Sequence, residues 1–312
     1  MIKVEHIVTP SSEQMEFVIQ GMRNPYNSWD KSDSGHCGGE DHIGCVYCSL
    51  AGDKAHNEKM IDMDLVYRHG IKPCGKKEFT GEYVLGHNDH ELMLKLAKAG
   101  TDHRKFMRQM PLMMRITAPL YFWKEFDTYK IGTVSNSCST MHTIAAKEFT
   151  HEDFSINKLA EITGADLELL DEYRNLGNME SVRCDLARYR YYFNIDDTIF
   201  NLNFARSLYM AADKNLKRGD LTDDEKKHIA AQKKKFWWQM IQLLPNSYNQ
   251  TRNIVMNYEV LANIYASRKN HKLDEWVQFC KLMEGIPYFD IVKAGCDKRT
   301  KSGDTNDENS QI

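Results

Sequence analysis

Two polar residues in a mostly apolar segment near the C-terminus are the first candidates for chemistry. Asn257 and Arg268 are eleven residues apart, with Leu261 and Ile264 between them. On one continuous helix that spacing is about three turns, so the four side chains would share a face. An amide and a guanidinium on such a face must find partners or point at a ligand, and both can bind pyrimidine edges, phosphates or flavin ring atoms. A solvated helix with an ordinary surface arginine is the alternative.

A group of cysteines is the second candidate. Cys37, Cys45, Cys48 and Cys74 could supply four thiolates, and Cys45 and Cys48 have the two-residue gap that lets both sulfurs reach one tetrahedral Zn2+. Only one such pair is present. A structural zinc site built from these four cysteines and a set of reduced free thiols are both open interpretations, and a redox pair is a third.

The segment from Leu243 to Trp276 resembles the C-terminal signature of the flavin-dependent thymidylate synthases, the ThyX family. The matching positions are Leu244-Pro245, Asn257, Asn263, Arg268, His271 and Glu275, with His271 one residue early. The resemblance implies that Asn257, Asn263 and His271 bind the flavin. It also implies that Arg268 is the catalytic and substrate-binding residue that holds the uracil ring.

A second stretch, after Ala118-Pro119, resembles the family less closely. Asn136 and Ser139 keep the spacing of an asparagine and a serine of the family motif, and the resemblance implies that both bind the substrate. The Arg-His-Arg of that motif is absent, and its place falls on residues 128–130 or 129–131. Lys130 is the surviving cation in either register, so we expect it to bind the flavin phosphates. The glutamine of the preceding family helix becomes Glu125 or Phe126.

Two family arginines that bind the nucleotide phosphate are missing, because Met141 and Ile241 stand at their places. Either other cations replace them, with Arg252 a substrate-binding candidate beside Arg115 and Lys124, or the substrate is not dUMP. His103 lies where the family has a histidine-rich segment and is therefore a candidate flavin-site residue. A capping or surface histidine is the alternative for that position.

The family's activity sets the functional expectation. FAD reduced by NADPH would take a one-carbon unit from methylenetetrahydrofolate and deliver it to C5 of dUMP, which yields dTMP. Family members are homotetramers, so an oligomer is expected. Two rival hypotheses remain: a flavin-dependent enzyme that modifies another pyrimidine nucleotide or installs another group, and a non-catalytic, metal-stabilised interaction protein on a ThyX-like scaffold.

Composition narrows the class of protein. The 312 residues are 42% hydrophobic and 27% charged, with a net charge of -3, which is an ordinary globular balance. The near-neutral charge argues against nucleic acid as a partner, and no apolar run is long enough to span a membrane. The start of the chain lacks the apolar region of a secretory signal. We therefore expect a cytoplasmic protein, and the resemblance to the ThyX family implies a small-molecule nucleotide substrate.

The elements that must position these residues suggest an α+β fold, a twisted antiparallel sheet packed with helices. Strands are predicted at 3–9 and 105–117, and helices at 13–22, 89–99, 118–129, 199–217, 222–245, 247–268 and 273–283. The ThyX-like core is expected at 1–23 with 81–149, which contain the sheet, and at 236–293, which is helical. Residues 24–80 are predicted to be a Cys/His-rich insertion, 150–235 a helical insertion, and 294–312 a disordered tail.

Overall fold

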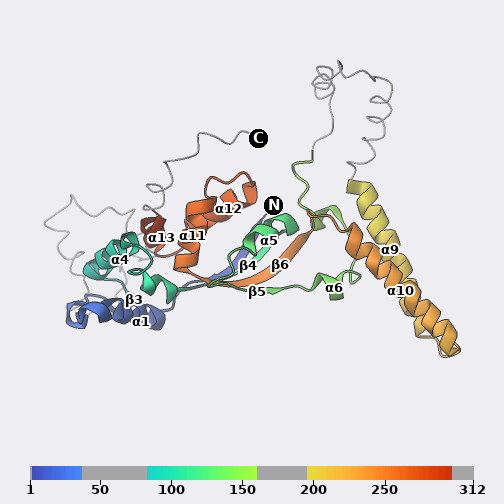
Figure 1. Ribbon diagram of the computed structural model, residues 1–312, viewed down its shortest axis with the longest axis horizontal. Helices are drawn as coiled ribbons and strands as arrows, with labels where there is room; N and C mark the ends of the chain where they lie inside the picture. The colour runs from blue at the N-terminus through green and yellow to red at the C-terminus, as the bar shows by residue number, and fades with distance from the viewer. Residues whose placement is uncertain (1, 37–82, 160–194, 297–312) are drawn as a thin grey trace, which may run out of the picture. The chain divides into compact units, whose positions relative to one another are not determined.

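The computed structural model describes residues 2–36, 83–159 and 195–296, in which helices and β-strands are mixed (Figure 1). The chain forms two compact units. Unit 1 comprises residues 118–123 and 137–251, and unit 2 comprises residues 2–117, 124–136 and 252–312. The predicted zinc ligands Cys37, Cys45, Cys48 and Cys74 lie outside the described residues. The same is true of most of the predicted insertion at 24–80 and of residues 160–194.

A four-stranded sheet has the order β1-β4-β6-β5. Its strands are β1 (Lys3–Val8), β4 (Pro111–Pro119), β5 (Val134–Ser137) and β6 (Asn249–Asn257). β1 pairs with β4 in the antiparallel sense. Along β4, Leu112, Met114 and Ile116 are buried while Met113 and Arg115 are exposed, so one face of the strand meets the core. The prediction of helices combined with an antiparallel sheet is confirmed.

The helices of unit 2 place the residues of the candidate site. They are α1 (Ser12–Arg23), α4 (His87–Ala99), α11 (Tyr258–Arg268), α12 (Asp274–Met283) and α13 (Phe289–Cys296), with the short 3-10 helices η1 (Asn24–Tyr26), η2 (Trp29–Lys31) and η4 (Lys105–Arg108). α13 packs against α4 and α11, and α11 also contacts α12 and η4. α11 is therefore the central helix of this unit, and Leu261 and Ile264 on it are completely buried.

A small second sheet pairs β2 (Gly35–His36) with β3 (Tyr83–Val84). Beside it, the buried carboxylate of Asp89 lies 2.5 Å from the Nε atom of Arg23. The same carboxylate accepts hydrogen bonds from the hydroxyls of Ser32 and Ser34. These bonds satisfy a charged pair that would otherwise be costly to bury, and they hold the segment after α1 against α4.

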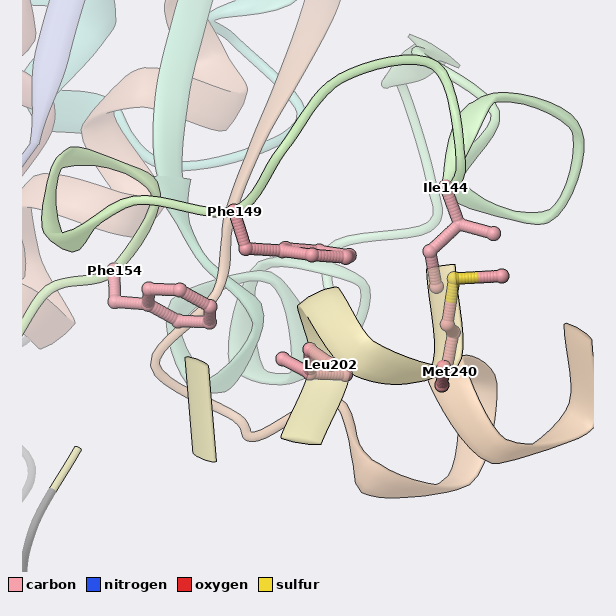
Figure 2. Packing of buried hydrophobic residues seen from close by; sticks show 6 residues of the cluster. Ile144, Phe149, Phe154, Leu202 and Met240 are labelled. Carbon is pink, nitrogen blue, oxygen red and sulfur yellow. The ribbon is translucent and has the colours of Figure 1, made fainter. Parts of the chain in front are cut away.

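Unit 1 is organised around a pair of long helices, α9 (Ile195–Leu216) and α10 (Asp223–Leu243), which lie side by side (Figure 1). It also contains the first residues of α5 (Leu120–Phe126), α6 (Thr140–Thr143) and η5 (His151–Asp153). Figure 2 shows its core. Leu202 of α9 and Met240 of α10 pack there with three residues of the segment after α6: Ile144, Phe149 and Phe154. A capping box of Thr222 and Glu225 begins α10, close to the predicted helix start at 222.

The predicted helix over 247–268 is wrong in its first half. Residues up to Asn257 form β6, and the helix starts only at Tyr258. Ile254 and Met256 are buried while Asn253 and Val255 are exposed, which is the two-residue period of a strand. Asn257 and Arg268 therefore do not share a helix face, because Asn257 is the N-cap residue of α11.

Smaller differences concern the ends of elements. The predicted strand at 105–117 begins with η4 and becomes β4 only at Pro111. α1 begins at Ser12, with Ser11 as its N-cap residue, one residue before the predicted start at 13. α13, which was not predicted, runs to the buried Cys296, so residues 294–296 of the expected tail are helical, and the rest of that tail lies outside the described residues. Among the described residues, no helix is long and apolar enough to cross a membrane.

Candidate active site around Arg268

Arg268 is held in the last turn of α11 by neighbours from two other segments of unit 2. Its Nε atom donates to the hydroxyl of Tyr129 at 3.0 Å, and its Nη1 atom donates to Oε2 of Glu125 at 2.6 Å. The guanidinium carbon lies 5.0 Å from the ring centre of Trp276 and 5.7 Å from that of Tyr129. A planar cation is thus fixed by hydrogen bonds in its plane and by aromatic faces.

Glu125 is the common acceptor of this cluster. The same Oε2 atom accepts from Arg268 and, at 3.1 Å, from the indole nitrogen of Trp276, and it lies 3.4 Å from Nε2 of His271. Three groups that carry hydrogen therefore converge on one carboxylate oxygen. The carboxylate also balances the charge of the guanidinium, which leaves the cluster without net charge when His271 is neutral.

The tautomer of His271 follows from its backbone contact. Nδ1 accepts a hydrogen bond from the backbone N–H of Leu273 at 3.1 Å, so in the neutral ring the proton must be on Nε2. Nε2 lies 2.6 Å from Nη1 of Arg268. Since both nitrogens then carry hydrogen, the favourable partner for each is Glu125 and not the other nitrogen.

Buried aromatic rings support the cluster. Trp276 stacks on Phe126 with ring centres 6.1 Å apart, and both side chains are almost completely buried. Trp276 also meets Tyr129 and Phe279 edge-on. Large rings with several ring partners have little freedom to move, so Glu125 and Arg268 are presented on a rigid base.

One side of the guanidinium remains open. Nη2 of Arg268 makes no hydrogen bond to any of the residues that the structure describes, and the side chain keeps 18% of its surface exposed. An arginine with two of its three nitrogens engaged and the third accessible is oriented for a ligand that offers a hydrogen-bond acceptor.

The start of α11 contacts the segment that follows Tyr129. Oδ1 of Asn257 accepts from the backbone N–H of Val260 at 3.0 Å, which closes the first turn of the helix. Gly132 has a φ of +79°, and a Cβ atom there would lie 2.9 Å from Val260 and 3.2 Å from Nδ2 of Asn257. Glycine is needed for both reasons, the backbone conformation and the close approach. The exposed Lys130 thus lies on a segment that touches α11 at both ends.

Asn263 faces a different neighbour. Its Oδ1 atom accepts from Nη2 of the buried Arg104 at 3.4 Å. Arg104 also donates to Oε1 of Glu259 at 3.0 Å and to the carbonyl of Gly295 at 2.8 Å, while Arg108 binds Oε2 of Glu259. Burial raises the pKa of Glu259, but hydrogen bonds from Arg108 and Arg104 outweigh it and leave that pKa below the ordinary value.

The other predicted residues of unit 2 lie outside this cluster. Arg252, proposed as a replacement phosphate ligand, donates from Nη1 to Oδ1 of Asp127 at 2.7 Å, so its charge is already balanced. Asn136 is exposed on β5. His103 is exposed in the turn before Arg104, and its backbone N–H donates to the carbonyl of Gly100.

Three of the positions discussed above belong to unit 1. Ser139 is the N-cap residue of α6, where its hydroxyl accepts from the backbone N–H of His142 at 3.3 Å. Met141 is half-exposed and offers its carbonyl to the indole of Trp237. Ile241 packs on the core of the unit. The side chains of Met141 and Ile241 supply no cation in place of the missing arginines.

Sequence reasoning missed part of the Arg268 cluster. Glu125 was considered only as the substitute for a family glutamine, and Tyr129 and Trp276 were given no role. The usable signal was the aromatic content of the segment around Glu125, because aromatic faces and carboxylates are the usual partners of a part-buried arginine. Within the described ranges, no group of three His, Cys, Asp or Glu side chains is placed to hold a metal ion.

No protein-family model and no curated protein matches the sequence. Solved structures with a similar chain path include two of the thymidylate synthase ThyX from Helicobacter pylori with FAD and dUMP. Each has 14% identity and a TM-score of 0.43, over 95% of this chain and 98% of that chain. Another is the UMP/dUMP methylase PolB from Streptomyces cacaoi, bound with 5-Br dUMP, with 10% identity and a TM-score of 0.39 over 96% of this chain and 95% of that chain. Identities and TM-scores this low carry no conclusion about which residues act here or what they bind.

Proposed function

We propose that this protein is a flavin-dependent enzyme that acts on a pyrimidine nucleotide. In the most specific form of the proposal it transfers a one-carbon unit from methylenetetrahydrofolate to C5 of dUMP, with FAD as cofactor and NADPH as reductant. The observation that carries the proposal is the hydrogen bond between Tyr129 and Arg268. It joins the two stretches of sequence that resemble the ThyX family, although 139 residues separate them in the chain.

In this proposal Arg268 binds and orients the pyrimidine ring. Its open Nη2 donates to a ring carbonyl oxygen, and it stabilises negative charge that develops there when a group is added at C5. Glu125 holds the guanidinium and cancels its formal charge, which suits a neutral carbonyl acceptor better than a phosphate. His271 keeps a proton on Nε2 through its bond from the backbone of Leu273, so it is a positioning residue in this proposal.

The available donors fit a flavin cofactor. Nδ2 of Asn257 makes no hydrogen bond within the described chain and can donate to an acceptor atom of the flavin ring edge, and the exposed ammonium of Lys130 can bind the diphosphate as a point charge. Bound FAD would supply the electron transfer between NADPH and the one-carbon unit. Asn263, His103 and His271 remain proposed flavin-site residues, and Asn136 and Ser139 remain proposed substrate ligands.

Absorption spectroscopy tests the proposal. The purified full-length protein, supplied with excess FAD and then desalted, is expected to keep a flavin spectrum that changes when dUMP is added. Arg268→Ala should keep the flavin but weaken the dUMP response, whereas Arg218→Ala, which removes an exposed arginine of unit 1, should change neither. A protein that cannot be loaded with FAD would contradict both enzyme hypotheses, the one with dUMP as substrate and the one with another pyrimidine nucleotide.

A second candidate function keeps the flavin site and changes the nucleotide. Met141 and Ile241 replace both phosphate-binding arginines of the family, and Arg252 is neutralised by Asp127. These substitutions favour a substrate whose phosphate is bound differently from that of dUMP. A spectral response to UMP or dCMP that exceeds the response to dUMP, at equal concentrations, would select this candidate.

A further inference from the structure

The outer face of α9 carries a regular stripe of exposed side chains. Leu202, Ala205 and Ala212 on the inner face are buried in unit 1. On the opposite face the spacing alternates between three and four residues, which is the repeat of a coiled-coil seam. The stripe consists of Asp197, Phe200, Phe204, Ser207, Ala211 and Lys214, all of which are exposed.

The two phenylalanines of the stripe are unusual for a surface helix. Phe200 and Phe204 are 67% and 58% exposed, and their rings stack on each other with centres 6.3 Å apart. Met210 beside the stripe is 44% exposed. Single exposed apolar residues are common, but two adjacent exposed phenylalanines in line on one helix are typical of a surface that a partner covers.

Opposite charges at the two ends of the stripe favour a second copy of this chain as the partner. Asp197 is acidic and near the start of α9, whereas Lys214 is basic and near its end, and neither makes an ion pair within the described part of the chain. We propose that α9 pairs with α9 of a second copy of this chain, in antiparallel orientation about a two-fold axis. This proposal uses no residue of the Arg268 cluster and does not depend on the proposed function.

In one register of the two antiparallel helices, every pair of facing seam residues is complementary in charge or in size. With the axis at the level of Ala205 and Arg206, Asp197 lies opposite Lys214 of the second copy. Phe200 then lies opposite Ala211 and Phe204 opposite Ser207, so each large ring meets a small residue, as interdigitated packing requires. A shift of seven residues in one direction puts Phe204 opposite Lys214, and a shift in the other leaves Lys214 without an acidic partner.

The length of the helix suits such a contact. α9 has 22 residues, about 33 Å at a rise of about 1.5 Å per residue. Between the charged Asp197 and Lys214, each copy presents Phe200, Phe204 and Ala211, with Ser207 among them and Met210 beside them. The two-fold symmetry makes each favourable contact occur twice, which is how a short self-complementary patch produces a dimer.

Sedimentation velocity on the full chain over a range of concentrations tests the proposal. The wild-type protein is expected to associate through this contact, and Phe204→Glu should raise the dissociation constant by at least about tenfold, because it removes a central aromatic anchor. Phe17→Glu is the matched control, since Phe17 is 62% exposed on α1, and it should leave association unchanged. Circular dichroism should show that both variants keep the wild-type helix content and melting temperature.

Charge reversal tests the antiparallel register separately. Asp197→Lys and Lys214→Asp should each weaken association about fivefold, because each places like charges opposite each other at two symmetric points. The double variant should restore the wild-type dissociation constant. A monomer at all concentrations, or association unaffected by Phe204→Glu, would overturn the proposal, and a double variant no stronger than the singles would overturn the register. Neither result bears on flavin binding.

Discussion

Arg268, in the last turn of α11, and Arg104, which packs against α11, have different surroundings. Arg104 is buried with 4% of its side chain exposed, and each of its three nitrogens binds an oxygen of the protein. Arg268 engages two nitrogens, leaves the third open and shares its acidic partner with Trp276 and His271. Arg104 is buried with every nitrogen engaged, so a ligand cannot easily reach it, whereas Arg268 is held in place with one nitrogen still accessible. Saturation of hydrogen bonds thus separates a structural charge from a candidate functional one.

The largest effect is expected at the buried arginine. Arg104→Ala should lower the free energy of unfolding by about 3 kcal/mol, because it leaves the carboxylate of Glu259 buried with one partner fewer. Denaturant unfolding measures this loss. Arg108→Ala removes the other partner of Glu259, but its side chain is 49% exposed, so the loss should stay below about 1 kcal/mol. Equal losses of unfolding free energy in Arg104→Ala and Arg108→Ala would contradict the proposal that the buried arginine matters more than the exposed one.

The open arginine should show the opposite pattern. Arg268→Ala should change the free energy of unfolding by no more than about 1 kcal/mol, yet weaken nucleotide binding about 10- to 100-fold, the usual value of a hydrogen bond from a charged group. Titration calorimetry with dUMP and denaturant unfolding measure the two effects. A variant that loses stability and keeps its affinity would make Arg268 a second structural arginine.

Only part of this comparison could be predicted from the sequence. The motif indicated Arg268 and His271, which lie close together because they are only three residues apart in the chain. Glu125 and Tyr129 lie 143 and 139 residues from Arg268, and one sequence carries no signal for pairs at that separation. The helices α10 and α12 were predicted well, because the capping box of α10 and the apolar periodicity of α12 are local properties.

The strand before α11 was misread because its sequence is ambiguous. Residues 249–257 contain polar side chains that interrupt the apolar pattern, and the strong helical signal that begins at Tyr258 was extended backwards over them. Burial in the sheet decides such cases, since neighbouring strands satisfy the backbone and the alternation of Ile254 and Met256 with exposed residues fits a strand. Asn257 itself was the local signal of the helix start, because asparagine is a favoured N-cap residue.

Asn257 combines a structural and a proposed binding role in one side chain. Its Oδ1 atom caps α11, and its Nδ2 atom is the proposed donor to the flavin. Asn257→Ala should cost about 1 kcal/mol of unfolding free energy through loss of the cap. Asn257→Asp keeps the capping oxygen and removes the Nδ2 donor, so stability should stay near wild type while FAD binding weakens. Thermal unfolding and flavin retention after desalting measure the two. Unchanged flavin retention in Asn257→Asp would remove Asn257 from the proposed flavin site.

The smallest effect concerns pH. The pKa of Glu259 is below its ordinary value of 4.5 in the folded state, because the hydrogen bonds from Arg108 and Arg104 outweigh the effect of burial. Its contribution to stability is therefore present above the unfolded pKa and is lost as the pH falls through the lower folded pKa. Denaturant unfolding across that window should show stability falling with acidity more steeply in the wild type than in Glu259→Gln. Parallel curves would contradict the assignment.

β6 ends at Asn257 and α11 begins at the next residue, with no connecting loop between them. The base of the helix that carries Arg268 therefore has no hinge, and its motion is tied to that of the sheet. The segment from Asp127 to Thr133 contacts α11 through Tyr129 and Gly132, and between these two contacts Ile131 is 92% exposed. We expect relaxation measurements to find rigid order parameters in α11 and at Tyr129, and lower ones only at the exposed residues 130 and 131 between the two contacts.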